Sequence, residues 1–106
     1  MSISETELKE PIAQQLSISD HTLAVDLADG RTISVPLAWF PRLSYGTPAE
    51  RANWRLIGKG AGIHWPDLDE DISIESLLAG RRSGETQASL QRWLKAREAD
   101  AKGRPL

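Results

Sequence analysis

Apolar and polar residues alternate on both sides of an Asp-Gly pair in residues 22 to 35, and this pattern constrains the fold more than any other feature of the chain. The apolar positions on the shared face would be Leu23, Val25, Leu27, Ile33 and Val35. The pair Asp29-Gly30 suits the positive φ values that a type I′ turn demands. The sequence therefore predicts a β-hairpin over these residues.

A further strand is expected directly before the hairpin. After Pro11, the residues Ile12, Gln14, Leu16 and Ile18 would share one side of an extended segment. Pro36 ends the second hairpin strand, and an apolar stretch with prolines nearby follows it. We expect that stretch, which holds Leu37, Trp39, Phe40 and Leu43, to form a short helical turn within a buried connector.

The segment Thr47-Pro48-Ala49-Glu50 has the signature of a helix start. A Thr N-cap, a proline at the first helical position and a glutamate at the third form a capping box, which predicts a helix from Pro48 to about Trp54. Two short strands, residues 55 to 58 and 62 to 65, would follow around a glycine-rich bend. A phosphate-binding loop would need a helix directly after that bend, so we interpret it as a turn.

The acidic run from Asp67 to Asp71 resembles the start of a calcium loop only superficially. The loop would require glycine at its sixth position and glutamate at its twelfth, where this chain has Ile72 and Leu78, so no metal site is expected. The acids would face solvent and lead into a helix capped by Ser73. In that helix Ile74, Leu77 and Leu78 would face inward, and Gly80 would end it.

An amphipathic helix is expected from Glu85 to about Ala99, with Leu90, Trp93 and Leu94 at helical spacing and docked on the sheet. The predicted fold is α+β: a small antiparallel sheet, made of the N-terminal hairpin meander and short strands, packs with two to three helices, the C-terminal amphipathic helix among them. With 106 residues, one core and one domain over residues 12–99 are expected. The ends, residues 1–11 and 100–106, would fray.

The chain has no cysteine, no signal-like start and no apolar run that could cross a bilayer, so we expect a cytoplasmic protein without membrane contact. Its net charge of −2 conceals blocks of opposite sign. Residues 81 to 106 carry seven bases against three acids. Such blocks usually mark solvated faces that attract each other weakly, although a basic segment is also modest evidence for a nucleic-acid surface.

Three segments together resemble the uncharacterised bacterial family called domain of unknown function 2442. They are the hairpin from Leu23 to Arg31, the proline-aromatic segment from Val35 to Trp39, and Gly62-Ile63-His64-Trp65-Pro66 leading through Asp69 to Gly80. The resemblance covers roughly residues 12 to 80. It implies a compact α+β domain without enzymatic activity, and some similar proteins look like antitoxin-type partners of another small protein.

Catalysis would have to use one of the two histidines, His21 or His64. His64 is the better candidate because Asp67 is close in sequence, but no Ser, Cys or second His completes a nucleophilic system. We therefore expect no enzyme, no catalytic residues and no cofactor. A strand histidine between Ile63 and Trp65 is the structural alternative.

Four tryptophans in so short a chain either supply core area or form part of an exposed aromatic and arginine patch. The predicted interaction surface consists of Trp39, Arg42, Arg51, Trp54, Arg55, His64 and Trp65. The expected partner is another small protein, and an open sheet edge would also allow a homodimer. The alternative is a nucleic-acid-associated transcriptional regulator whose phosphate contacts would be Arg81, Arg82, Arg92, Lys95 and Arg97.

Overall fold

The alternating residues of the hairpin form the two strands that their pattern predicts. In the computed structural model, which describes residues 11–103, β2 (Thr22–Leu27) pairs antiparallel with β3 (Thr32–Pro36), and Val25 lies opposite Ile33. The expected type I′ turn is wrong, because only Gly30 of the Asp-Gly pair has a positive φ (+95°). Gly30 N–H donates to the Leu27 carbonyl at 3.1 Å, so a turn closed by one left-handed glycine joins the strands.

The strand before the hairpin is β1 (Ala13–Ile18), which pairs antiparallel with β2. Its buried residues are Ala13 and Leu16, whereas Gln14 is exposed. The prediction that Ile12 and Gln14 lie on the same face as buried Leu16 is therefore wrong. The cause is a register shift between Ala13 and Gln15, since an extra residue in one strand moves the following side chains to the other face.

A second antiparallel sheet follows, with strand order β4-β5-β6. Its strands are β4 (Arg55–Ile57), β5 (Gly62–Trp65) and β6 (Glu70–Ser73). The sequence pattern predicted β4 and β5 but missed β6, because its acidic residues were expected to lie in solvent before a helix. In the structure β6 pairs with β5, and its Ile72 lies buried opposite Ile63.

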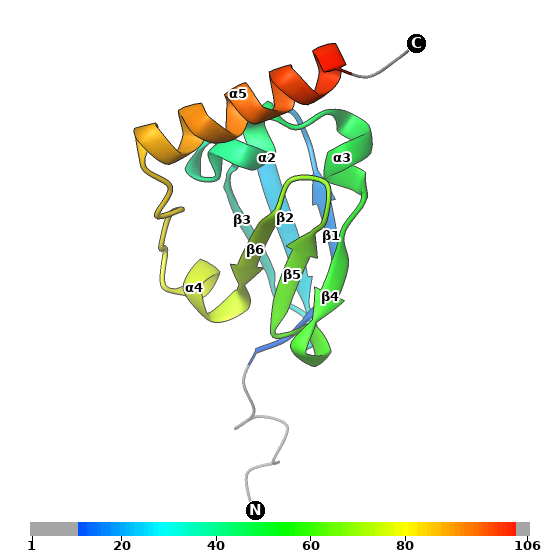
Figure 1. Ribbon diagram of the computed structural model, residues 1–106. Coiled ribbons are helices and arrows are strands. Elements are labelled where there is room, and N and C mark those ends of the chain that lie inside the picture. Colours follow the sequence, from blue (N-terminus) through cyan, green and yellow to red (C-terminus); the bar gives the residue numbers. More distant parts are fainter. Residues whose placement is uncertain (1–10, 104–106) are drawn as a thin grey trace, which may run out of the picture.

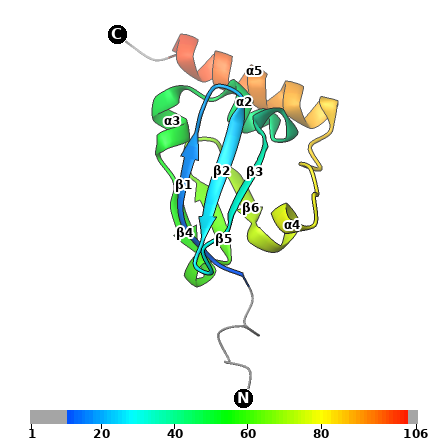
Figure 2. The same ribbon diagram turned by 180° about the vertical axis from the view of Figure 1, so that it is seen from behind.

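The two sheets lie face to face, as Figures 1 and 2 show from opposite sides. Their inner side chains form one hydrophobic cluster. Its wholly buried members include Leu23, Val25, Ile63, Trp65 and Leu68. The α+β class is confirmed, with two small sheets in place of the single sheet that was expected.

Short helices connect and cover the sheets. They are the 3₁₀ turn η1 (Leu37–Trp39), α2 (Pro41–Tyr45), α3 (Pro48–Ala52), the 3₁₀ turn η2 (Gly58–Gly60) and α4 (Ile74–Leu78). The predicted capping box of α3 is present. In α4, Ser73 caps the start and Gly80 (φ +73°) follows the end as predicted, but Leu78 is 39% exposed and does not face inward.

The C-terminal helix is α5 (Gln87–Gly103). It crosses the end of the molecule at which α2 and α3 lie, so the prediction that it docks on a sheet face is wrong (Figures 1 and 2). Leu90 is its buried apolar residue, and Trp93 and Leu94 are half-buried. The helix ends at Gly103, four residues beyond the end expected near Ala99. Residues 1–10 and 104–106, for which fraying was expected, lie outside the described part. None of the helices within residues 11–103 has the length and apolar character that a membrane span requires.

Candidate functional site

The predicted surface from Trp39 to Trp65 does not form one continuous face. Trp65 has no exposed area, and its indole Nε1 donates to the Arg51 carbonyl at 3.0 Å. Trp65 is therefore a core residue, and its assignment to an interaction surface is wrong. Alternation in β5 explains this position, because Ile63 and Trp65 point inward while His64 points outward.

Two other tryptophans are covered by arginines. The guanidinium of Arg82 lies 4.9 Å from the centre of the Trp39 ring. Trp93 on α5 is contacted by Arg42 at 5.2 Å and by Arg97 at 4.6 Å. Through these cation–π contacts, the two tryptophan rings and the three arginines already bind partners within the protein itself.

Arg42 joins the connector to the segment before α5. Its guanidinium donates to both carboxylate oxygens of Glu85, at 3.2 Å for the Nη2 contact, and to the Asp69 carbonyl at 3.1 Å. The hydrogen bond from Arg42 holds the pKa of Glu85 below its ordinary value. Nearby Glu70 is half-buried, and its partial burial raises its pKa to about 7. Arg42 is therefore a structural residue, because its guanidinium already donates to Glu85 and Asp69 and its side chain is only 17% exposed.

His64 lies on the outer face of the second sheet, between Arg55 on β4 and Asp71 on β6. Its Nδ1 makes a hydrogen bond with the Asp71 carboxylate, and not with Asp67, the carboxylate considered from the sequence. Asp67 instead accepts from the Asn53 amide at 2.9 Å. Within the described part of the chain, no group of three or more His, Cys, Asp or Glu side chains could hold a metal ion.

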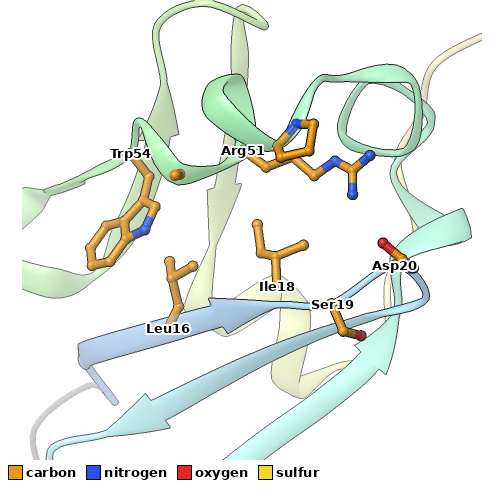
Figure 3. Close-up of a pocket in the computed structure, with 8 residues that line it drawn as sticks. Leu16, Ile18, Ser19, Asp20, Arg51 and Trp54 are labelled. Carbon is orange, nitrogen blue, oxygen red and sulfur yellow. The ribbon is translucent and has the colours of Figure 1, made fainter.

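Arg51 and Trp54 do come together, and they do so beside β1. They form one wall of a groove of about 270 Å³ whose other wall is the end of the first sheet (Figure 3). The residues that line the groove are Leu16, Ile18, Ser19, Asp20, Pro48, Arg51, Ala52 and Trp54. The Arg51 Nε and Nη2 atoms donate to the Gly46 carbonyl at 3.1 and 2.8 Å, which holds the arginine along α3.

The open edge of the first sheet runs along this groove. The strand order is β1-β2-β3, so β1 has a neighbour on one side only. Of the groove residues, only Arg51 and Trp54 were predicted from the sequence, and those contributed by β1, by the turn after it and by the rest of α3 were not. A usable signal was present, since β1 contains neither charge nor proline, an uncommon composition for an edge strand.

The proposed phosphate contacts do not form a uniform set. Arg82 stacks on Trp39, and Arg97 pairs with Glu50 at 2.8 Å. Arg81, Arg82, Arg92 and Lys95 are exposed. The structure therefore commits two of the five cations to contacts within the protein.

The chain resembles proteins whose functions are not described. The family model described as "Protein of unknown function (DUF2442)" matches residues 17–83. A crystal structure of a protein of unknown function from Rhodospirillum rubrum is similar, with 30% identity and a TM-score of 0.62, over 76% of this chain and 96% of that one. No curated protein matches the sequence.

A solution NMR structure of an uncharacterised protein from Chromobacterium violaceum shares the fold, with a TM-score of 0.60 and 21% identity over 69% of each chain. The three segments that carried the resemblance, the hairpin, the proline-aromatic connector and the Gly62 to Gly80 segment, all lie within the matched residues or overlap them. Because the family model covers more than half of the chain, this protein belongs to the DUF2442 family.

Proposed function

We propose that this protein is a non-enzymatic interaction domain that binds another small protein, in the manner of an antitoxin, through the groove between β1 and α3. The observation that carries the proposal is the meeting of Trp54, Arg51 and the apolar side chains of β1 at an open sheet edge. Aromatic residues and arginine are enriched at the centres of protein interfaces.

The arrangement around His64 supports binding over catalysis. The His64–Asp71 pair lies on the outside of a sheet, with Asp71 67% exposed, so water is not excluded from it. Ser73, two residues further along β6, uses its hydroxyl to accept the Ser76 N–H at 3.0 Å. This hydroxyl therefore caps α4 and is not oriented by the histidine.

Nucleic-acid binding is the second candidate, and the exposed Arg81, Arg92 and Lys95 favour it. It ranks below protein binding because Arg82 and Arg97 are engaged elsewhere and the net charge is −2. Binding to nucleic acid through these residues would weaken steeply with added salt, since each phosphate contact releases counterions.

Affinity purification from the native host at low salt tests both candidates. Three forms are compared: the wild type, Ala52→Lys, which places a charge at the groove, and Ala49→Lys, which changes an exposed residue of the same helix outside the groove lining. A stoichiometric protein that is retained by wild type and Ala49→Lys but lost by Ala52→Lys is the expected result. If nucleic acid alone is recovered and salt releases it, the second candidate would replace the proposal.

A further inference from the structure

We infer that the partner contributes an extended segment that pairs with the open edge of β1 as an additional strand of the first sheet, with alternate apolar side chains in the groove. This inference rests on the proposed function and specifies how the partner binds. In this mode of recognition, main-chain hydrogen bonds give affinity, and pockets for alternate side chains give selectivity.

The hydrogen-bond pattern of β1 shows which of its backbone groups are available. Ser19 N–H donates to the Thr22 carbonyl at 2.9 Å, and Ser17 lies opposite Ala24. Hydrogen-bonded and non-hydrogen-bonded pairs alternate along an antiparallel ladder, so Ser17 bonds to β2 while the N–H and C=O groups of Leu16 and Ile18 point outward. Within residues 11–103, no backbone group forms a hydrogen bond with these outward groups.

The other sheet edges carry features that discourage strand addition. Pro36 ends β3 and removes an N–H donor. The three-residue β4 begins with Arg55, and β6 carries Glu70 and Asp71. By contrast, β1 is six residues long and uncharged, so it is the edge best suited to pair with another chain.

The groove supplies the side-chain sites that such a strand would need. In Figure 3, the side chains of Leu16 and Ile18 rise from β1 toward the wall that contains Trp54 and Arg51. Successive side chains of an added strand would alternate between this inner face and the outer face. The inner positions are therefore expected to be apolar near Leu16 and Trp54.

The opposite end of the groove is polar. Figure 3 shows Asp20 and Arg51 there, on opposite walls, and these two described residues do not form an ion pair with each other. A polar side chain at that end of the added strand could hydrogen-bond to both. The matching segment is therefore extended and apolar at alternate positions, with a polar residue at the Asp20 end.

A second copy of this chain fits the groove poorly. Its β1 would present Leu16 and Ile18 on the inner face, but Leu16 is only 7% exposed because it already packs in its own core, and Ile18 is half-buried. These side chains cannot fill the groove of a neighbour without leaving their own positions. The better occupant is a segment of a different polypeptide whose inner side chains are free.

Selection from a phage-displayed library of random eight-residue peptides against the full chain tests the inference. The affinity of an enriched peptide is then compared in matched pairs of variants. Ile18→Pro removes an outward N–H of β1, while Ser34→Pro makes the same change at an outward position of β3. Ala52→Lys alters the groove, and Ala49→Lys is its control; Ala52 is exposed, so this pair does not depend on core packing.

We expect peptides with apolar residues at every second position, whose binding weakens at least about tenfold in Ile18→Pro and Ala52→Lys but not in the controls. The Leu16 and Ile18 amides should exchange rapidly in the free protein and slowly in the complex. Failure to enrich peptides, or affinities that neither variant alters, would overturn the inference, as would amides already protected in the free protein. A natural partner that Ile18→Pro retains but Ala52→Lys loses would preserve the proposed function, which places the partner in the groove, while rejecting strand addition.

Discussion

Arg97 on α5 and Glu50 on α3 are 47 residues apart in the sequence and form a two-point contact between the two helices. Arg97 Nη1 donates to Glu50 Oε2 at 2.9 Å, and Nη2 donates to Oε1 at 2.8 Å. The same carboxylate accepts the Thr47 N–H at 2.9 Å in the capping box. Glu50 therefore stabilises the start of one helix and the docking of another, and the bond from Arg97 is the main reason that its pKa is lowered to about 2.

Arg97→Ala should destabilise the protein by about 1 kcal/mol near pH 7, because a partly exposed bidentate pair and a contact with Trp93 are lost. Urea unfolding measures this change, and exposed Arg92→Ala should alter stability by less than about 0.5 kcal/mol. A carboxylate with a depressed pKa stabilises the folded state above its unfolded pKa of about 4.5, and this contribution is lost as the pH falls toward 2. Wild type and variant should therefore converge in acid; a constant difference would contradict this role for the ion pair.

Glu70→Gln should stabilise the protein above pH 7. Burial raises the pKa of Glu70 to about 7, so between pH 4.5 and 7 the folded state binds more protons than the unfolded state, and stability falls as the pH rises. Glutamine cannot ionise, so Glu70→Gln avoids this loss of unfolding free energy. After allowance for solvent screening, the gain should be about 1 to 2 kcal/mol above pH 7 and close to zero at pH 4. Urea unfolding at both pH values measures it, and an equal gain at both would exclude titration of Glu70 as the cause.

Trp65→Phe should destabilise the protein by about 2 to 3 kcal/mol, because the smaller ring leaves a cavity and the Arg51 carbonyl loses its donor. Half-buried Trp54→Phe should cost less than about half as much. Thermal or urea unfolding compares the two. Similar losses of unfolding free energy in the two variants would show that the complete burial of Trp65 and its hydrogen bond do not make it more important for stability than Trp54.

Gly60→Ala should be more harmful than Gly30→Ala. Both glycines have positive φ values, +96° and +95°, so alanine at either position costs about 1 to 2 kcal/mol in backbone strain. A Cβ at Gly60 would also lie 2.9 Å from the Ala13 carbonyl oxygen, whereas a Cβ at Gly30 would meet nothing within 4 Å. The difference in unfolding free energy therefore isolates the clash with β1, and equal costs would mean that β1 moves away freely.

Local chemistry determined much of the secondary structure. The hairpin strands, the capping box at Thr47 and the cap at Ser73 follow from neighbouring residues, and all are present in the fold. The type I′ turn at Asp29-Gly30 was a local error, but two other errors arose where a distant contact decided the outcome. The bulge in β1 exposes Gln14, and pairing with β5 makes a strand of the acidic segment at Glu70.

The candidate site was only partly visible in the sequence. Arg51 and Trp54 were selected because their residue types are common in interfaces, but the same reasoning also selected Trp65, which is wholly buried. Residue type alone does not distinguish a core tryptophan from a surface tryptophan. That difference depends on which side of β5 faces the first sheet.

The sequence by itself determined the α+β class, most of the strands and the helix starts, because alternation and capping act over a few residues. Only the tertiary structure decided that β1 forms an edge, that α3 lies beside it and that Trp54 faces Leu16 across a groove. Such a site depends on residues about 30 to 40 positions apart, and their proximity follows from the packing of two sheets. No local pattern in the chain encodes that arrangement.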